Sequence, residues 1–218
     1  TQEETTSLLK MLVYVMDFKS TQTVRHTINT ASYAATIGEL MGCSQKQIDK
    51  LYTAALLHDL GKMAIPESIL ESPTNLSNVE FILMKTHVGY TIKLLQNSVP
   101  EDIFKIAAHH HEKLDGTGYP FGLTAEQLSI EERILTVADI VSALIDNRTY
   151  KAEYSKEKVI EICQEMVQDG QLDSSIVKVV ENNFDKFKED AASRNKFMSV
   201  PLGLVEMLFH EEMDYESL

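Results

Sequence analysis

Several histidine and aspartate residues of this chain are adjacent or consecutive, a pattern that suits metal binding. His58 and Asp59 form one such pair, and three histidines are consecutive at 109–111. Asp139 interrupts the apolar run 134–141, where a buried carboxylate needs a compensating charge. An adjacent histidine and aspartate present one nitrogen and two carboxylate oxygens to the same point in space, and a carboxylate can bridge two cations.

None of these residues is diagnostic alone. His87, which has apolar neighbours, is most simply interpreted as a core histidine. The set carries weight because its members come from five predicted helices, each at an inward or terminal position. They are His26, His58, Asp59, His87, His110, His111 and Asp139. Imidazole and carboxylate without thiolate suit Fe, Mn, Zn or Ni, and this many ligands exceed those of one tetrahedral ion, so we expect at least two metals.

Helices must position these residues, because apolar residues recur at helical spacing along the chain and no stretch alternates for long with a period of two. We therefore predict an all-α fold. Ser44, Ser77 and Ser129, each followed three residues later by Gln or Glu, predict capping boxes. The expected helices lie around 5–18, 24–40, 44–61, 77–95, 100–111 and 129–144, two more begin at 155 and 173, a short amphipathic candidate lies at 201–213, and the longest loop spans 112–125.

Length and composition restrict the class of protein. The 218 residues form one large domain, or one domain with an appendage. No apolar run approaches about 18 residues, so we expect no membrane span, and the lack of a charged-then-apolar leader favours a cytoplasmic protein. The two cysteines exclude a disulfide framework and a cysteine-based zinc finger. A net charge of −13 argues against binding of polymeric nucleic acid through a basic face.

Five motifs follow one another along the chain. They are His58-Asp59-Leu60-Gly61-Lys62, Met84-Lys85-Thr86-His87, the run from His110-His111-Glu112 to Gly118-Tyr119-Pro120, Val137-Ala138-Asp139 and Arg148-Thr149-Tyr150-Lys151. Over about residues 20–188 this set resembles the HD superfamily of metal-dependent phosphohydrolases, and within it the HD-GYP subfamily. The resemblance implies an HD-type helical bundle with a metal centre between helices, plus extra C-terminal helices. We expect a linker or packing helix at 1–20, the HD-GYP domain at 21–188 and an acidic helical appendage at 189–218.

The resemblance implies a role for each motif residue. Metal ligation falls on His26, His58, Asp59, His87, His110, His111 and Asp139, with Asp59 bridging two ions. Lys62 is expected to contact the scissile phosphate, while Arg148 and Lys151 hold the phosphates of the substrate. Gly118 and Tyr119 belong to the loop beside the site, where the tyrosine either stacks on a guanine or packs to hold the loop.

The function that the resemblance implies is hydrolysis of cyclic di-GMP to pGpG, and in some members on to GMP, through a metal-bridged hydroxide. Asp59 and Lys62 would then be the catalytic residues. The cofactor would be a binuclear divalent metal centre, with Fe or Mn favoured and Zn or Ni also compatible. Diguanylate cyclase (GGDEF) domains docking on the loop and a homodimer are the further partners that the family suggests.

Two positions depart from the family pattern. Gln22 stands where many members have a glutamate able to hold a third metal, so we predict a binuclear centre. Ser142 stands where a second aspartate is usual, which removes a charge near the site and predicts weaker activity. Three alternatives stay open: a weak or inactive cyclic-dinucleotide sensor or adaptor, an HD-family nucleotidase, and a hydrolase of cyclic GMP-AMP.

Overall fold

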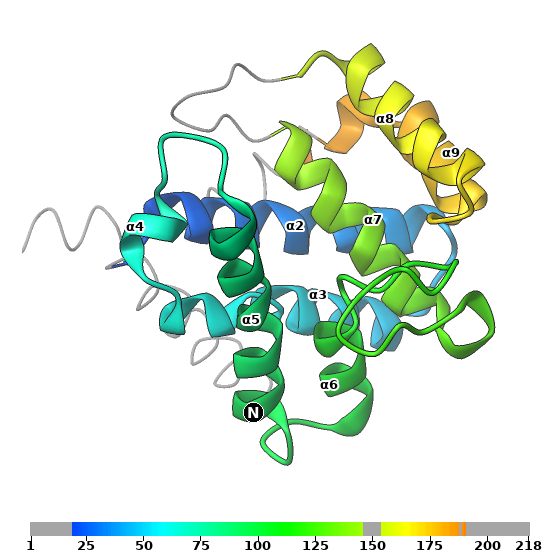
Figure 1. The fold of residues 1–218 in the computed structure, drawn as a ribbon. Helices are drawn as coiled ribbons and strands as arrows, with labels where there is room; N and C mark the ends of the chain where they lie inside the picture. The colour runs from blue at the N-terminus through cyan, green and yellow to red at the C-terminus, as the bar shows by residue number, and fades with distance from the viewer. Residues whose placement is uncertain (1–18, 146–153, 188, 191–218) are drawn as a thin grey trace, which may run out of the picture.

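The computed structural model describes residues 19–145, 154–187 and 189–190, and within them every regular element is a helix (Figure 1). The longer helices are α2 (Thr21–Leu40), α3 (Gln45–Leu57), α5 (Asn78–Leu95), α6 (Glu101–Ala108), α7 (Ile130–Ile145), α8 (Lys156–Gln168) and α9 (Ser174–Asn182). Three short elements complete the list: α4 (Glu67–Leu70), η1 (Leu60–Ala64) and η2 (Ala125–Gln127). The prediction of an all-α fold is confirmed. None of the described helices combines the length and apolarity needed to cross a membrane.

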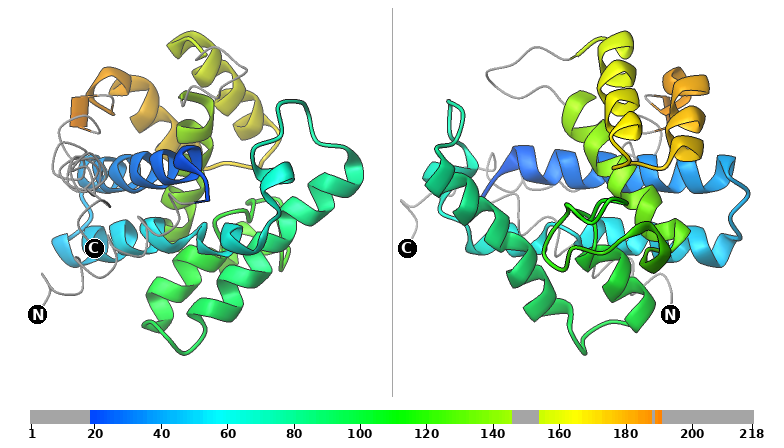
Figure 2. Two further views of the ribbon diagram at one scale, coloured as in Figure 1. Left: turned by 90° about the vertical axis from the view of Figure 1, so that its left-hand side faces the viewer. Right: turned by 45° about the vertical axis from the view of Figure 1, so that its right-hand side comes forward.

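Helices α2, α3 and α7 form the centre of the bundle. Helix α2 packs along α3 and against α7, while α5 lies against η1 and beside α6. Figures 1 and 2 show α8 and α9 as a pair at one end of α7, far from the α5–α6 pair. The central helices contact both pairs, and the loop after α6 also reaches the α8–α9 side, where Leu114 N–H donates to the Gln171 carbonyl at 3.0 Å.

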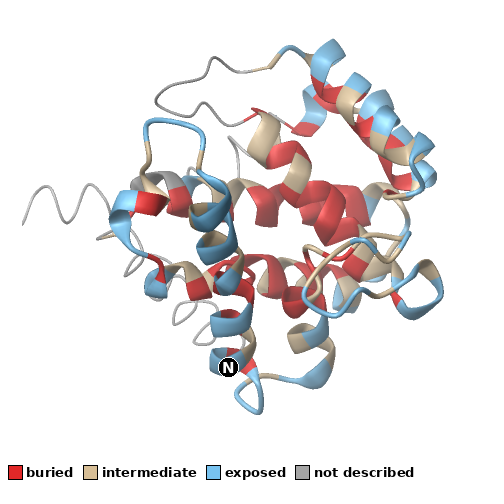
Figure 3. Cartoon of the chain, in the orientation of Figure 1, coloured by how far each residue is buried: buried red, intermediate tan, exposed pale blue. Residues whose placement is uncertain are grey.

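The buried residues gather where the central helices face one another (Figure 3). Small residues allow the close approach: Ala31 and Ala34 on α2 and Ala54 on α3 are all fully buried. The three predicted capping boxes, at Ser44, Ser77 and Ser129, are confirmed. In each, the serine side chain accepts from the backbone N–H three residues on, and the side chain of that residue accepts from the serine N–H. Local sequence therefore sets where these helices begin, and packing of small residues sets how closely they lie.

Two helix ends differ from the prediction. Helix α3 ends at Leu57 and the turn η1 begins at Leu60, whereas the expected helix ran to Gly61. The cause is a contact with α5: Gly61 N–H donates to Thr91 Oγ1 at 2.9 Å, and the Thr91 hydroxyl donates to the His58 carbonyl at 3.0 Å. These bonds replace the ones that a continued α-helix would make.

The second difference is at α6, which ends at Ala108 and not at about His111. His109 still donates its backbone N–H to the Lys105 carbonyl at 3.0 Å, but Glu112 N–H then turns back to the His109 carbonyl at 2.8 Å. Residues 109–111 therefore form a turn. The predicted helices at 5–18 and 201–213, and nearly all of the segments 1–20 and 189–218, lie outside the described residues.

Gly61 should tolerate no side chain. A Cβ at this position would lie 1.9 Å from the His87 carbonyl oxygen and 2.6 Å from Thr91 N, both backbone atoms of α5. We expect Gly61→Ala to lower the free energy of unfolding by about 3 kcal/mol, measured by urea denaturation. The control is Gly89→Ala on α5, where a Cβ meets nothing within 4 Å. This variant should be neutral or should raise the free energy of unfolding by about 0.5–1 kcal/mol. Equal effects of the two variants would contradict the packing argument.

Candidate metal centre

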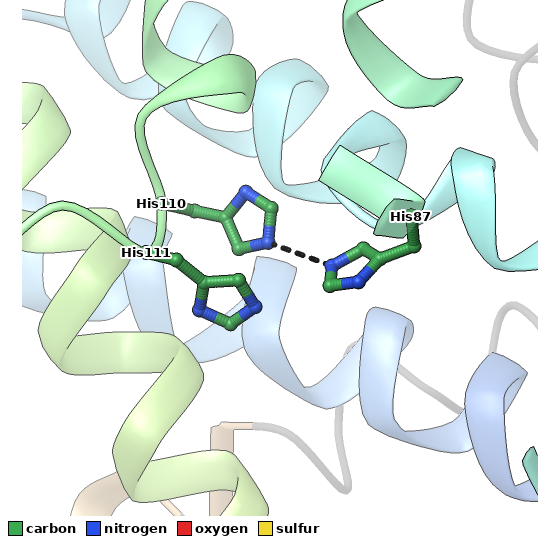
Figure 4. Close-up of side chains that lie close together, drawn as sticks. All are labelled: His87, His110 and His111. Carbon is green, nitrogen blue, oxygen red and sulfur yellow. Dashed lines mark hydrogen bonds between the residues drawn. The ribbon is translucent and has the colours of Figure 1, made fainter. Parts of the chain in front are cut away.

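The seven predicted ligand residues converge on one point between the helices. His26 lies on α2, His87 on α5 and Asp139 on α7. The pair 58–59 directly follows α3, and the pair 110–111 lies one residue beyond the end of α6. The ring centroids of His26 and His58 are 5.8 Å apart, and those of His58 and His110 are 4.8 Å apart. Figure 4 shows His110 and His111 facing the ring of His87 across the centre of the bundle. Five elements thus deliver side chains to a single buried cluster.

The carboxylate of Asp59 lies between two groups of imidazoles. Its Oδ2 atom is 3.1 Å from His58 Nε2 and 3.7 Å from His26 Nε2. Its Oδ1 atom is 3.3 Å from His87 Nε2 and 4.0 Å from His110 Nε2. Each oxygen therefore faces a different pair of ring nitrogens, which is the arrangement that a bridging carboxylate requires.

The potential ligand atoms of the described residues form three groups, of which one, His58, His110 and Asp139, shares a histidine with each of the other two. His26, His58 and Asp59 form one group, and His87, His110 and His111 form another; within each, the atoms lie within 4.8 Å of one another. Asp139 lies beside both groups, since its Oδ1 is 2.8 Å from His26 Nε2 and its Oδ2 is 3.7 Å from His111 Nδ1. The described residues could therefore hold more than one ion, with the two carboxylates in between.

Three of the histidines are held in the tautomer that metal binding needs. The Nδ1 atoms of His58, His87 and His110 lie 2.6, 2.7 and 2.7 Å from the carbonyl oxygen three residues earlier. A carbonyl only accepts, so each Nδ1 carries a proton and each Nε2, the atom left to bind a metal, points into the cluster. The local chain thus orients these rings before any ion binds.

The approach of two such nitrogens supports a cation between them. His87 Nε2 and His110 Nε2 are 3.4 Å apart, along the dashed line of Figure 4. With both Nδ1 atoms protonated, neither Nε2 of the neutral rings has a proton to donate. Two nitrogens that share one tetrahedral ion, each about 2.1 Å from it, would lie about 3.4 Å apart. The separation therefore fits a shared ion better than a hydrogen bond.

Unsatisfied atoms and charge also fit a metal. Among the described residues, His58 Nε2 and Asp59 Oδ1 are buried and have no hydrogen-bond partner, and the 3.1 Å approach of His58 Nε2 to Asp59 lacks hydrogen-bond geometry. Buried polar atoms of this kind are costly unless something binds them. A divalent ion would satisfy both atoms at once.

The pKa shifts follow from burial and from the two carboxylates. Burial opposes the charge of His58, but Asp59 and Asp139 outweigh it and raise the pKa of His58 to about 10. Burial likewise opposes the charge of Asp59, and the neighbouring His58 and Lys62 hold its pKa well below the usual range. Burial is the main cause that lowers the pKa of His111 to about 4. Without metal, a proton on His58 partly balances the carboxylates.

Lys62 contacts the same carboxylate. Its Nζ lies 2.5 Å from Asp59 Oδ2, so in this structure the ammonium pairs with the centre of the cluster. The expected contact of Lys62 with a substrate phosphate stays a prediction. Arg148 and Lys151 lie outside the described residues, as does the side chain of Gln22.

The loop 112–125 places Tyr119 against the cluster. The Tyr119 ring lies 4.8 Å from the His111 ring at an angle of 33°, and its backbone N–H donates to the His111 carbonyl at 3.1 Å. Gly118 makes this approach possible, because a Cβ there would be 2.4 Å from Glu112 Cα. These contacts support the packing role of Tyr119, and stacking on a guanine stays a prediction.

A buried glutamate, to which no role was assigned from the sequence, holds this loop. Glu112 is 1% exposed, and its two carboxylate oxygens accept from Phe121 N–H at 2.7 Å and Leu123 N–H at 2.8 Å. In the sequence only the position of Glu112, directly after His111, could have indicated this role, because a glutamate at the start of a loop is normally exposed to solvent. His109, which is not among the predicted ligands, pairs with Glu132 on α7.

A helical bundle built around imidazoles and two buried carboxylates defines a class of metal-site protein. The HD domain family matches residues 9–176, so the chain belongs to this family, as a member of its HD-GYP type. Among solved structures, an HDG"Y"P protein from Bdellovibrio bacteriovorus matches with a TM-score of 0.61 and 19% identity, covering 73% of this chain and 51% of that one. This likeness supports the fold alone.

Two curated relatives share more of the sequence. The chain is 33% identical over 190 residues to the 3'3'-cGAMP-specific phosphodiesterase 2 of Vibrio cholerae, covering 85% of this chain and 36% of that protein. It is 37% identical over 147 residues to a cyclic di-GMP phosphodiesterase of Thermotoga maritima, covering 66% of this chain and 40% of that protein. The chain thus spans well under half the length of these relatives.

Metal binding should release protons from the metal-free protein. Because the pKa of His58 is raised to about 10, this ring is protonated at pH 7.5 and must lose its proton to bind an ion. Calorimetric titration with Mn²⁺ in buffers of different ionisation enthalpy should show a net release of about one proton at pH 7.5. The number of protons released should fall as the pH is raised from 7.5 toward the pKa of His58. Binding without proton release at pH 7.5 would exclude His58 from the metal site.

Proposed function

We propose that this chain is a metal-dependent phosphodiesterase that hydrolyses cyclic di-GMP. The observation that carries the proposal is Asp59, whose two oxygens face two different groups of imidazole nitrogens. Relatives named as cyclic di-GMP and 3'3'-cGAMP phosphodiesterases support the same class of substrate. A cyclic dinucleotide has two phosphodiester groups and is therefore a small dianion, which suits a metal-charged site in a protein that is acidic elsewhere.

The proposed centre is binuclear. His26 and His58, whose Nε2 atoms lie 2.8 and 3.4 Å from Asp139 Oδ1, would hold one ion together with Asp139. His87, His110 and His111 would hold the other, with Asp59 shared between the two ions. Fe or Mn is the favoured metal, and Zn or Ni is compatible with the same ligands. Two divalent ions at such a site lower the pKa of bound water and neutralise charge on a reacting phosphate.

The protein residues then position the substrate. Lys62, which lies beside Asp59, would place its ammonium next to the scissile phosphate as that phosphate approaches the centre. Arg148 and Lys151 would hold the phosphates of the dinucleotide. Tyr119 and Gly118 would form the wall of the pocket beside His111. Asp59 and Lys62 are therefore the proposed catalytic residues, and pGpG is the first product, with GMP following if the linear dinucleotide rebinds.

The loop also suggests the proposed protein partner. Phe121 on this loop is 55% exposed, and its ring lies edge-on to that of His109, 5.4 Å between centroids. We propose this surface as the docking point for diguanylate cyclase domains, which the family resemblance suggests, and a homodimer as the assembly. Both proposals rest on the resemblance together with this exposure.

A second candidate substrate is 3'3'-cGAMP. The observation that favours it is the sequence similarity to three Vibrio cholerae phosphodiesterases named as specific for that molecule. It differs from cyclic di-GMP in one base only, so the metal cluster treats the two alike. Discrimination would come from residues that contact the base.

Turnover tests the proposed function directly. Protein loaded anaerobically with Fe(II) or Mn(II) should convert cyclic di-GMP to pGpG, and a parallel reaction with 3'3'-cGAMP ranks the two substrates by kcat/KM. Asp59→Ala should lose both metal and turnover, whereas Asp169→Ala, an exposed carboxylate at the end of α8, should keep both. Chromatography of the products is the measurement. Binding of cyclic di-GMP without any product from micromolar enzyme would identify a sensor, and cleavage of mononucleotides alone would identify a nucleotidase.

Metal content tests the binuclear centre. We expect two ions per chain after loading and desalting, because Gln22 offers a neutral amide where a third ion would need a carboxylate. Inductively coupled plasma mass spectrometry against protein concentration gives the ratio. Three ions per chain would refute the assignment, and Asp59→Ala should fall well below two because the shared ligand is lost.

A further inference from the structure

Ser142 contacts one of the proposed metal ligands. It lies on α7 one helical turn after Asp139, and its side chain is fully buried. Its Oγ atom is 3.2 Å from His26 Nδ1, and the hydroxyl donates to the His26 carbonyl at 3.4 Å. Ser142, which replaces a charged residue of the family pattern, is therefore a direct neighbour of the His26 ring.

This contact differs in kind from those of the other orienting groups. His58, His87 and His110 each place Nδ1 against a backbone carbonyl, which only accepts. A serine hydroxyl both donates and accepts, so it is compatible with a proton on either nitrogen of His26. His26 is therefore less firmly held in the metal-ready tautomer.

The other nitrogen of His26 is already satisfied without a metal. His26 Nε2 lies 2.8 Å from Asp139 Oδ1, which is a good hydrogen bond when Nε2 carries the proton. In that tautomer Nδ1 carries no proton, and the Ser142 hydroxyl can turn from the His26 carbonyl to donate to Nδ1, 3.2 Å away. An ion on this side must replace the bond between His26 Nε2 and Asp139. His26 must therefore change tautomer: Nε2 loses its proton, and Nδ1 carries one and donates it to Ser142 Oγ.

The opposite side of the centre has no contact as short as this one, because His87 Nε2 lies 3.3 Å from Asp59 Oδ1. His87 Nε2 and His110 Nε2 face one another at 3.4 Å with their lone pairs already directed inward. An ion there relieves a repulsive contact, whereas an ion at His26 exchanges one favourable contact for another. Binding should therefore be tighter on the side of His87.

We propose that the two halves of the centre load in sequence, and that Ser142 is the positioning residue that sets the affinity of the second ion. The first ion binds on the His87 side. The second binds on the His26 side, and its affinity depends on the hydroxyl that accepts from His26 Nδ1. This inference rests on the binuclear centre of the proposed function but not on the identity of the substrate.

Metal titration of the whole chain tests the proposal without substrate. Mn²⁺ is added stepwise to metal-free protein, bound metal is measured against a competing chelator, and electron paramagnetic resonance separates a mononuclear signal from a coupled pair. The wild type should fill in two steps. His87→Ala should lose the tight step, and His26→Ala should lose the weak one.

Ser142 variants then separate positioning from mere packing. Ser142→Ala should weaken only the second step, by about 10–100-fold. Ser142→Asp keeps an acceptor for Nδ1–H and fixes the metal-ready tautomer, so it should strengthen that step at least about tenfold. Thr136→Ala is the matched control: its hydroxyl lies buried on the same helix but donates to the Glu132 carbonyl, and neither step should change.

The outcomes are decisive in each direction. Two ions of equal affinity in the wild type, an unchanged second step in Ser142→Ala, or an equal loss at both steps would overturn the inference. If circular dichroism shows that Ser142→Ala does not fold, the Ser142→Asp protein decides, and an unchanged or weakened second step would overturn it. Sequential loading with the expected Ser142 effects, but no hydrolysis of either dinucleotide, would support the inference while rejecting the proposed function.

Discussion

The buried carboxylate of Asp59 is the constraint on which the rest of the structure depends. It is 1% exposed, and four imidazoles and the Lys62 ammonium lie within 4.0 Å of its oxygens. A charge removed from water in this way is strongly destabilising unless opposite charges or ligands surround it. Helices from distant parts of the chain must therefore meet at this point, and the bundle is arranged so that they do.

Close backbone contacts make that meeting possible. The turn after α3 lies directly against α5, because Gly61 has no side chain and Thr91 bonds to both Gly61 N–H and the His58 carbonyl. The loop after α6 closes in a similar way, where Gly118 lies on the backbone of Glu112. In both places a glycine sets the distance between a ligand-bearing turn and its neighbour, so small changes in packing would alter the spacing of the ligands.

Local signals explain what the sequence could predict. The helix starts at Ser44, Ser77 and Ser129 depend on residues three positions away, and each was correctly predicted. The grouping of the ligand residues followed from their chemistry and from the motifs. The early ends of α3 and α6, and the contact between Ser142 and His26, could not be predicted, because each depends on a partner from another helix that no local pattern specifies.

The hydrogen bonds between ring and backbone at His58, His87 and His110 orient each ring independently of how the helices pack together. Each ring is aimed by the carbonyl three residues before it, so its direction belongs to its own segment, while the distances between rings belong to the folded bundle. An ion that binds the assembled rings but not the scattered ones favours the folded state by mass action. For this chain the concentration of free metal would then be a variable of folding itself, because the two proposed ions and the shared Asp59 would together join α2, α5, α7 and the turns after α3 and α6 as removable cross-links.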